Sequence, residues 1–224
     1  MDVELARFNM IEQQIRPWDV LDSHVLDLLA AVRREDFVPP ALKALAFVDM
    51  QVPLRPGEAA VLRGQVMLEP RVEARMLQDL QVQKHEKVLE IGTGSGFMAA
   101  LLGHQSQRVL TLEIDDELAE TARQNLQKAG VLNVEVRTAD GASADLSAHG
   151  PFDVIVLSGS VASVPDHLLA LLNRGGRRMG IVGEEPMMRA TLVQSAGSGL
   201  VTTQPWDTVA PRLIGFPEPQ RFSF

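Results

Sequence analysis

The first third of the chain places apolar residues three or four positions apart. This spacing predicts helices over 2–16 and 23–34, a short helix from Pro39–Pro40 to Phe47, and a helix over 70–80. Proline at position 70 suits the first turn of the last of these helices. Prolines and glycines interrupt 49–68 so often that no period holds there, which predicts a loop.

Beyond position 80, apolar runs alternate with helical periods. The runs predict strands at 88–91, 108–114, 133–137, 152–157 and 177–182, with shorter strand-like stretches at 191–194 and 200–203. Helices are expected from 97, over 116–129 and over 165–172. The alternation predicts a doubly wound, mostly parallel, Rossmann-like α/β sheet. We expect one domain over 1–224, with a helical N-terminal cap and substrate loop over 1–80 and an α/β core over 81–224.

Glycines occupy every second position directly after the first strand, at Gly92, Gly94 and Gly96. A strand, a glycine turn and a helix start let a ligand approach the backbone closely. Dinucleotide folds use Gly-x-Gly-x-x-Gly, but Phe97 stands where their last glycine would be. Glu90, at the mouth of the strand, would repel a pyrophosphate and suit the amino group of an amino acid. The stretch therefore predicts a site for S-adenosyl-L-methionine, which is cationic and has no phosphate, and so a methyltransferase.

Two further carboxylates follow predicted strands, and ligands of open α/β sheets bind outside the carboxyl ends of the strands. Glu113 ends the second strand, where it can accept hydrogen bonds from both ribose hydroxyls. Asp140 follows the third strand, where it can accept from the adenine amino group while Gly141 lets the ring come close. Each acid has an alternative role as a helix cap or a solvated loop charge. The expected cofactor-binding residues are Glu90, Gly92, Thr93, Gly94, Gly96, Glu113, Ile114, Asp140 and Gly141.

The composition bounds the protein class. A length of 224 residues with 46% hydrophobic content suffices for one good core. The formal net charge of −8 argues against nucleic acid as a partner. Cysteine is absent, which leaves the redox compartment undetermined. Neither a secretory signal nor a membrane-spanning apolar run is visible, so we expect a cytoplasmic protein without a membrane partner. Five histidines are scattered without metal-ligand spacing, which predicts no metal site: His24, His85, His104, His149 and His167.

Several stretches resemble the protein-L-isoaspartate O-methyltransferase family. They are Val88–Gly96, Pro151–Val156, Leu171–Gly176 and, in the N-terminal part, Ala31–Val38, Gly64–Gln65, Pro70 and Ala74–Met76. The resemblance covers nearly the whole chain, and its N-terminal part is specific to this family. It implies transfer of a methyl group from S-adenosyl-L-methionine to the carboxylate of isoaspartyl residues in damaged proteins, a repair reaction with a protein or peptide substrate. By position it also implies cofactor contacts from Gly92, Gly94, Glu113, Asp140 and Gly141.

The family's substrate loop has the sequence Gly-Gln-Thr-Ile-Ser-Gln-Pro, and its serine lies by the methyl acceptor. In this chain Leu68 stands at the serine position and Glu69 at the second glutamine. The candidate catalytic positions are Glu69, Leu68 and Ser158, which follows the fourth strand. Glu69 also permits an alternative in which it acts as the base for a neutral acceptor, including a small molecule. An ordinary role for Glu69 at a helix N-terminus is open as well.

Two alternative functions belong to other classes of protein. A protein that binds the cofactor without catalysis is one alternative. An NAD-dependent dehydrogenase is disfavoured by Phe97 and Glu90. The sequence leaves the acceptor, the conformation of 49–70 and the oligomeric state open.

Overall fold

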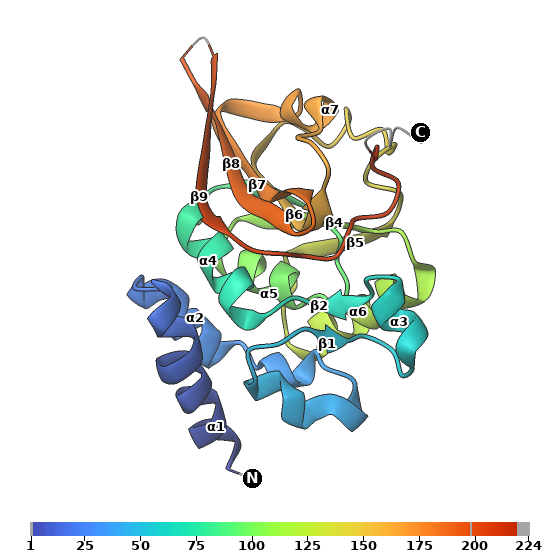
Figure 1. Ribbon diagram of the computed structural model, residues 1–224. Helices are drawn as coiled ribbons and strands as arrows, with labels where there is room; N and C mark the ends of the chain where they lie inside the picture. Colours follow the sequence, from blue (N-terminus) through green and yellow to red (C-terminus); the bar gives the residue numbers. More distant parts are fainter. Residues whose placement is uncertain (1, 198, 219–224) are drawn as a thin grey trace.

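The computed structural model describes residues 2–197 and 199–218, and a twisted sheet runs through its centre (Figure 1). Over these residues the sheet has seven strands in the order β5-β4-β3-β6-β7-β8-β9. Their bounds are β3 (Lys87–Ile91), β4 (Arg108–Glu113), β5 (Val134–Thr138), β6 (Phe152–Val161), β7 (Leu172–Glu184), β8 (Met187–Ala196) and β9 (Gly199–Asp207). The first five in spatial order pair in parallel, and β8 and β9 pair antiparallel. The expectation of a mostly parallel doubly wound sheet is confirmed.

Two apolar layers cover the sheet, because successive side chains of a strand point to opposite faces. Val88, Val154 and Val156 pack on the face covered by α4 (Pro70–Leu80), α5 (Phe97–Gln105) and α6 (Asp116–Lys128). Leu89 and Ile155 pack on the other face, near α7 (Asp166–Leu169). The central strands are therefore buried on both sides, as their continuous apolar runs predict.

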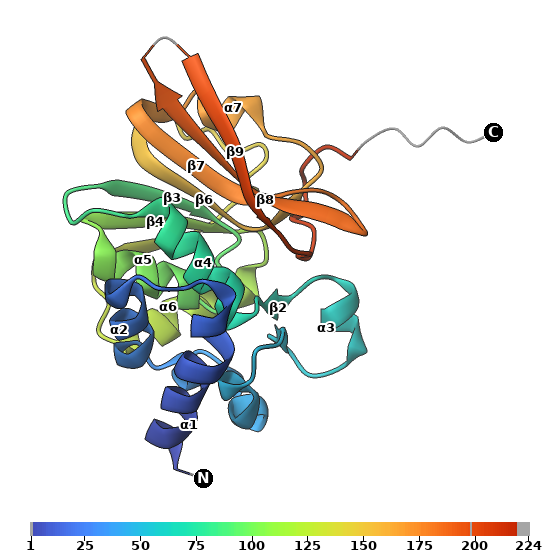
Figure 2. The ribbon, with the colours of Figure 1, turned by 60° about the vertical axis from the view of Figure 1, so that its left-hand side comes forward.

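The N-terminal segment packs outside α4 and α5, at the lower end of the molecule in Figure 2. It contains α1 (Val3–Met10), a π-helical turn η1 (Ile11–Ile15), the 3₁₀ turns η2 (Arg16–Trp18), η3 (Arg34–Asp36) and η4 (Pro40–Phe47), and α2 (Ser23–Ala31). Its apolar residues belong to the same buried cluster as those of α4 and α5. Among the described residues, no helix is long and apolar enough to span a lipid bilayer.

Local structure differs from the sequence prediction in several places, and the helix predicted over 23–34 ends at Ala31. The predicted loop over 49–68 contains β1 (Val52–Pro53), α3 (Glu58–Leu62) and β2 (Val66–Met67), which are too short to show a period. The helix expected to reach position 172 ends at Leu169, and β7 begins at Leu172. β6 continues to Val161 because the segment after β9 supplies hydrogen-bond partners. The N–H of Ser160 donates to the carbonyl of Pro211 at 2.7 Å, and the N–H of Leu213 donates to the carbonyl of Ser160 at 2.9 Å.

A buried arginine joins the N-terminal segment to the helices above the sheet. The guanidinium of Arg34 pairs with the carboxylate of Glu73 on α4, and one of its nitrogens donates to the carbonyl of Leu68 at 2.7 Å. It also lies over the ring of Phe97, at the start of α5, with its central carbon 5.1 Å from the ring centroid. Three segments distant in sequence are thus held by one side chain.

We expect Arg34→Ala to lower the free energy of unfolding by about 3–5 kcal/mol, because it leaves the Glu73 carboxyl buried without its partner. The matched control is Arg33→Ala, one residue earlier. Arg33 is 59% exposed and bridges Glu35 and Asp36 at 3.3 and 3.6 Å, so its loss should cost at most about 1 kcal/mol. Urea denaturation of both variants measures the difference, and equal losses would contradict a clamping role for Arg34.

Candidate active site

A cleft lies outside the carboxyl ends of β3, β4 and β6, where ligands of open α/β sheets bind. The cleft encloses a volume of about 90 Å³. The lining residues come from three parts of the sequence: Leu54, Arg63, Gly64, Gln65 and Val66; Ile91, Gly92, Gly94, Leu112, Glu113, Ile114, Asp115, Leu118, Ala139, Gly141 and Ser158; and Arg212, Leu213 and Ile214. The cleft therefore exists only where these three parts meet.

The three alternate glycines all have positive φ, at 92°, 53° and 87°, but they serve different ends. A Cβ on Gly92 would lie 2.8 Å from Leu213 Cδ2, so this glycine is required where the C-terminal segment crosses the turn. A Cβ on Gly96 would lie 3.3 Å from Leu126 of α6, so Gly96 serves the packing of α5 on α6. Gly92 and Gly94 line the cleft, whereas Gly96 does not line it and contacts α6 instead.

Glu113 ends β4 and presents its carboxylate to the cleft beside Ile114. The carboxylate accepts hydrogen bonds from the N–H of Gly94 at 2.8 Å and from the N–H of Asp115 at 3.1 Å. Burial raises the pKa of the Glu113 carboxyl, while these two backbone donors oppose the rise. The glycine turn and the acid predicted to contact ribose are thus in direct contact.

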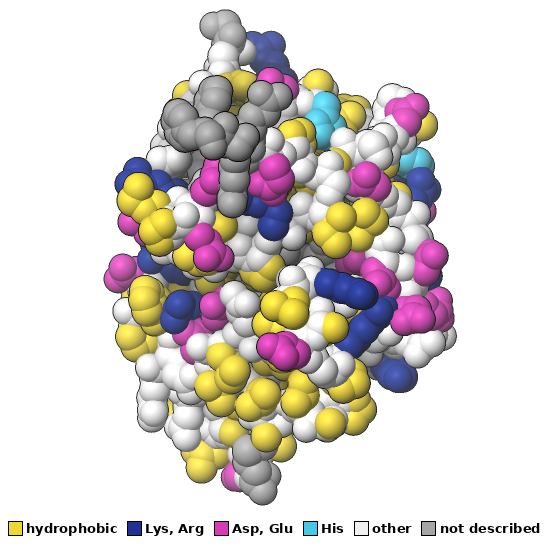
Figure 3. Space-filling view, turned by 45° about the vertical axis from the view of Figure 1, so that its right-hand side comes forward, with side chains coloured by type: hydrophobic (Ala, Val, Ile, Leu, Met, Phe, Trp, Pro, Cys, Tyr) yellow, Lys and Arg dark blue, Asp and Glu magenta, His cyan; other side chains and the backbone are white. Residues whose placement is uncertain are grey.

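The hairpin of β1 and β2, which contains α3, forms one wall of the cleft. Ion pairs and a hydrogen bond hold it in place. Arg55 pairs with Asp115 at the start of α6 and lies 3.2 Å from Glu117. Gln65 Nε2 donates to the second carboxylate oxygen of Asp115 at 3.1 Å. Figure 3 views the molecule from this side and shows basic and acidic side chains next to one another on the face. These contacts between the hairpin and the start of α6 close the cleft on one side.

Glu90 does not lie at the mouth of the strand, contrary to the sequence prediction. Its side chain is fully buried on the α4 side of the sheet, because Leu89 and Ile91 take the other face. The Thr111 hydroxyl donates to one of its oxygens at 2.7 Å, and the Ser158 hydroxyl lies 2.7 Å from the other. The Thr111 hydroxyl also lies 2.6 Å from that of Thr93. Burial, together with the nearby carboxyls of Glu73 and Glu113, raises the pKa of Glu90 to about 8.

Asp140 also differs from the expectation, since it does not line the cleft. Its carboxylate accepts from the N–H of Ala142 at 2.9 Å and the hydroxyl of Ser143 at 3.0 Å. A Cβ on Gly215 would lie 2.5 Å from the carboxylate, so the acid lies against the C-terminal segment. Its neighbours Ala139 and Gly141 do line the cleft. The acid stabilises the turn that brings them there.

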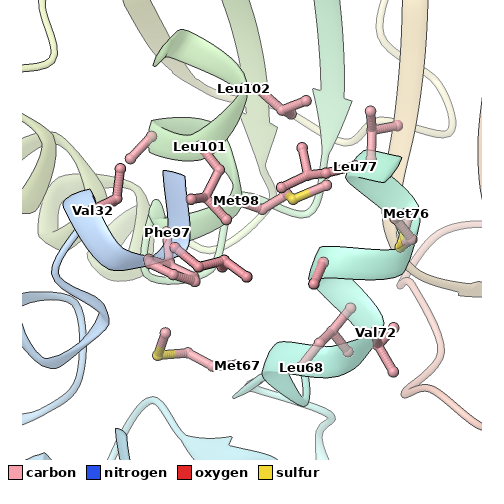
Figure 4. Packing of buried hydrophobic residues seen from close by; sticks show 14 of the residues in the cluster. Val32, Met67, Leu68, Val72, Met76, Leu77, Phe97, Met98, Leu101 and Leu102 are labelled. Atoms are coloured by element: carbon pink, nitrogen blue, oxygen red, sulfur yellow. The ribbon is translucent and has the colours of Figure 1, made fainter. Parts of the chain in front are cut away.

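Leu68 and Glu69 point into different cavities. Leu68 is buried and lines a small cavity with Val66, Met67, Glu73, Gly92, Thr93, Gly94, Ser95, Phe97, Met98 and Ser158. Figure 4 shows it with Met67 at the foot of α4, in the cluster that Phe97 joins from α5. Glu69 instead lines a groove with Trp18 and Trp206, and it lies 3.4 Å from Gln51 Nε2. The Glu69 carboxylate, expected at the acceptor, thus lies outside both the cleft and the small cavity in this structure.

Sequence reasoning missed the residues that approach the cleft from far along the chain. Leu54, Leu213 and Ile214 line it, and none lies in a motif. A contact such as Leu213 on Gly92 joins positions far apart in sequence and leaves no local pattern. The Gly64–Gln65 pair was the available signal for the α3 wall, because it forms part of the family resemblance.

Residues 6–210 match the family model described as "Protein-L-isoaspartate(D-aspartate) O-methyltransferase (PCMT)". The chain belongs to this family. It is 37% identical over 203 residues to "Protein-L-isoaspartate O-methyltransferase 1" of Syntrophobacter fumaroxidans, covering 91% of both proteins. It is 36% identical over 211 residues to the "Protein-L-isoaspartate O-methyltransferase" of Koribacter versatilis, covering 94% of this chain and 91% of that protein.

A solved structure supports the fold of this family member. A Plasmodium falciparum protein described as a protein-L-isoaspartate O-methyltransferase, in complex with S-adenosyl-L-homocysteine, superposes with a TM-score of 0.76. The match covers 92% of this chain and 97% of that one at 17% identity, so it shows the fold alone. The predictions of the fold, the family and an S-adenosyl-L-methionine-dependent methyltransferase are confirmed.

The buried Glu90 carboxyl predicts a pH dependence of stability. A glutamate ionises near 4.5 in the unfolded chain and near 8 in the folded protein, so the folded state holds a proton that the unfolded state has released. The free energy of unfolding should therefore fall as the pH rises from about 4.5 to about 8. One pKa unit corresponds to about 1.4 kcal/mol, which makes the effect a few kcal/mol.

Glu90→Gln removes this titration, because glutamine does not ionise. We expect wild type to lose stability relative to the variant between pH 5 and pH 8, and denaturant titrations at several pH values measure this. The comparison with the variant separates Glu90 from Glu73, whose pKa burial raises to about 7. A stability difference that stays constant with pH would show that Glu90 is ionised throughout.

Proposed function

We propose that this chain transfers a methyl group from S-adenosyl-L-methionine to the side-chain carboxylate of L-isoaspartyl residues in proteins or peptides. One observation supports this function most directly. The family match over 6–210 includes the glycine turn, Glu113 and the loop 64–70, and these three meet at one cleft. Relatives at 36–37% identity bear the name of this activity.

The residues of the cleft fit the proposed donor. The Glu113 carboxylate is a hydrogen-bond acceptor for paired ribose hydroxyls, and apolar Ile91, Leu112 and Ile114 suit a planar base. Gly92 and Gly94 let a ligand approach the backbone. Arg63 and Arg212 line the same cleft and supply positive charge for a carboxylate group. Four other predicted residues do not line the cleft and instead hold the glycine turn, α5 and the neighbouring loop in place. They are Glu90, Thr93, Gly96 and Asp140.

The acceptor side is proposed to be the small cavity beyond Gly92 and Gly94, framed by the 1–80 part of the chain. Val66, Met67 and Leu68 form one side of it, and Thr93, Ser95 and Ser158 form the other. Because the cleft and the cavity share residues, an acceptor in the cavity would meet a donor in the cleft.

The reaction depends mainly on the alignment of the methyl donor with the acceptor carboxylate. An isoaspartyl carboxylate is already ionised at neutral pH, so no residue has to remove a proton. When bound, the donor supplies a methyl group on a positively charged sulfur, and the C–S bond breaks as a carboxylate oxygen forms the new C–O bond. The protein's contribution is to hold the two in line and to exclude water. The alternative with Glu69 as base has no support in the geometry, since Glu69 lines a different groove.

The proposal predicts methylation of an isoaspartyl peptide. Incubation with methyl-labelled S-adenosyl-L-methionine should transfer label to a peptide that contains L-isoaspartate and not to the same peptide with ordinary aspartate. The labelled ester should be released by mild base, as expected of a methyl ester. Binding of S-adenosyl-L-homocysteine without any labelling of the isoaspartyl peptide would overturn the proposed acceptor and favour a protein that binds the cofactor without this catalysis.

A second prediction tests the donor site alone. Glu113→Gln should weaken the binding of S-adenosyl-L-homocysteine by about 10- to 100-fold, because hydrogen bonds to a charged group contribute roughly 1.5–3 kcal/mol. The matched control is Glu135→Gln, a glutamate on the next strand that is exposed and lies outside the cleft. Isothermal titration calorimetry measures both. Equal affinities of the two variants would remove Glu113 from the donor site.

A further inference from the structure

The cleft and the small cavity meet at four residues: Val66, Gly92, Gly94 and Ser158. The reacting atoms of a donor and an acceptor have to meet at this junction. Valine and glycine offer no side-chain hydrogen bond, so Ser158 is the one residue of the four with a polar side chain. It is also only half-buried, which leaves it accessible from the site.

The other two hydroxyls of the small cavity, from Thr93 and Ser95, do not line the cleft and so lie away from the junction. The Thr93 hydroxyl lies 2.6 Å from that of Thr111, and Thr93 is buried. The Ser95 hydroxyl accepts from the N–H of Phe97 at 3.3 Å, at the start of α5. The loop side of the cavity offers only apolar side chains, from Val66, Met67 and Leu68. Ser158 is therefore the side chain best placed to meet an acceptor oxygen.

We propose that the Ser158 hydroxyl donates a hydrogen bond to the acceptor carboxylate, and that the Glu90 carboxyl, 2.7 Å behind it, orients this hydroxyl. Glu90 is then a positioning residue, because it acts through Ser158. This inference rests on the proposed function, since it requires a carboxylate acceptor.

The direction of the Ser158 hydrogen bond depends on the proton of Glu90. The two side chains lie 2.7 Å apart. An ionised Glu90 can only accept, so the serine hydrogen turns inward and an oxygen lone pair faces the acceptor carboxylate. A protonated Glu90 donates to the serine oxygen instead, which frees the serine hydrogen to point to the acceptor. Only the second arrangement attracts a carboxylate.

The surroundings of Glu90 favour the protonated form. Burial raises its pKa most, and the hydrogen bonds with Ser158 and Thr111 oppose this rise. Glu73 on α4 and Glu113 on β4 raise the pKa further, and Arg34, a cation on the α4 side, pairs with Glu73. Thr111 holds the second oxygen of Glu90 at 2.7 Å and so fixes the orientation of the carboxyl.

The first test is Ser158→Ala. We expect the dissociation constant of an isoaspartyl peptide, measured by calorimetry with saturating S-adenosyl-L-homocysteine, to rise at least about tenfold, as for the loss of a hydrogen bond to a charged group. Binding of S-adenosyl-L-homocysteine itself should change less than about threefold. Ser163→Ala, an exposed serine on the loop after β6, serves as the matched control. Unchanged peptide affinity in Ser158→Ala overturns the proposal.

The second test separates positioning from a merely structural role of Glu90. In wild type, KM for the peptide should rise as the pH passes about 8, where Glu90 loses its proton. In Glu90→Gln the side-chain amide donates to Ser158 at every pH, so this rise should disappear; in Ser158→Ala it should disappear as well. A rise that persists in both variants, or a loss of S-adenosyl-L-homocysteine binding in Glu90→Gln by tenfold or more, contradicts the positioning role.

The two proposals can fail separately. If wild type binds and methylates the isoaspartyl peptide and Ser158→Ala does so with equal affinity, the role of Ser158 is wrong and the proposed function stands. If wild type binds S-adenosyl-L-homocysteine but neither binds nor methylates the peptide, both are wrong, because the carboxylate acceptor is lost.

Discussion

The site depends on the contacts that the Arg34 guanidinium makes. It holds the backbone of Leu68, the carboxyl of Glu73 and the ring of Phe97 at once. Each belongs to a different element, and together they set the distance between the loop 64–70 and the glycine turn. A guanidinium suits this task because its several donors lie in one plane and its charge persists when buried. The junction of the cleft and the small cavity follows from this contact.

Three carboxyl groups lie near that junction, which is an unusual number for a buried region. Glu73 and Glu113 lie close enough to Glu90 to raise its pKa, and of these three carboxyls only Glu73 pairs with Arg34. Burial of charge without full compensation is costly. The raised pKa values show how the protein limits this cost, by keeping protons on groups that would be ionised in water. Perturbed carboxyls of this kind often mark functional sites.

Sequence patterns predicted the layout of the sheet and the residues nearest the cleft. Gly92, Gly94 and Glu113 follow from the strand-turn-helix pattern, because the carboxyl ends of adjacent parallel strands share one edge. The orientation of Glu90 was also within reach: Leu89 and Ile91 are apolar and take one face, so the residue between them takes the other. The sides taken by Leu68 and Glu69 depend on how Arg34 holds the loop backbone, and the position of Leu213 depends on a distant contact. Neither leaves a local signal.

The construction of the cleft from three distant parts of the chain has a thermodynamic consequence. Leu54, Glu113 and Leu213 come together only when the whole fold is formed, so the donor cleft is absent from the unfolded chain. A ligand that binds the native state alone shifts the folding equilibrium by mass action. Occupancy of the cleft is therefore coupled to the lifetime of the protein. A cell that depletes the donor would hold the same polypeptide in a less stable form, more open to proteolysis, without any change in its sequence.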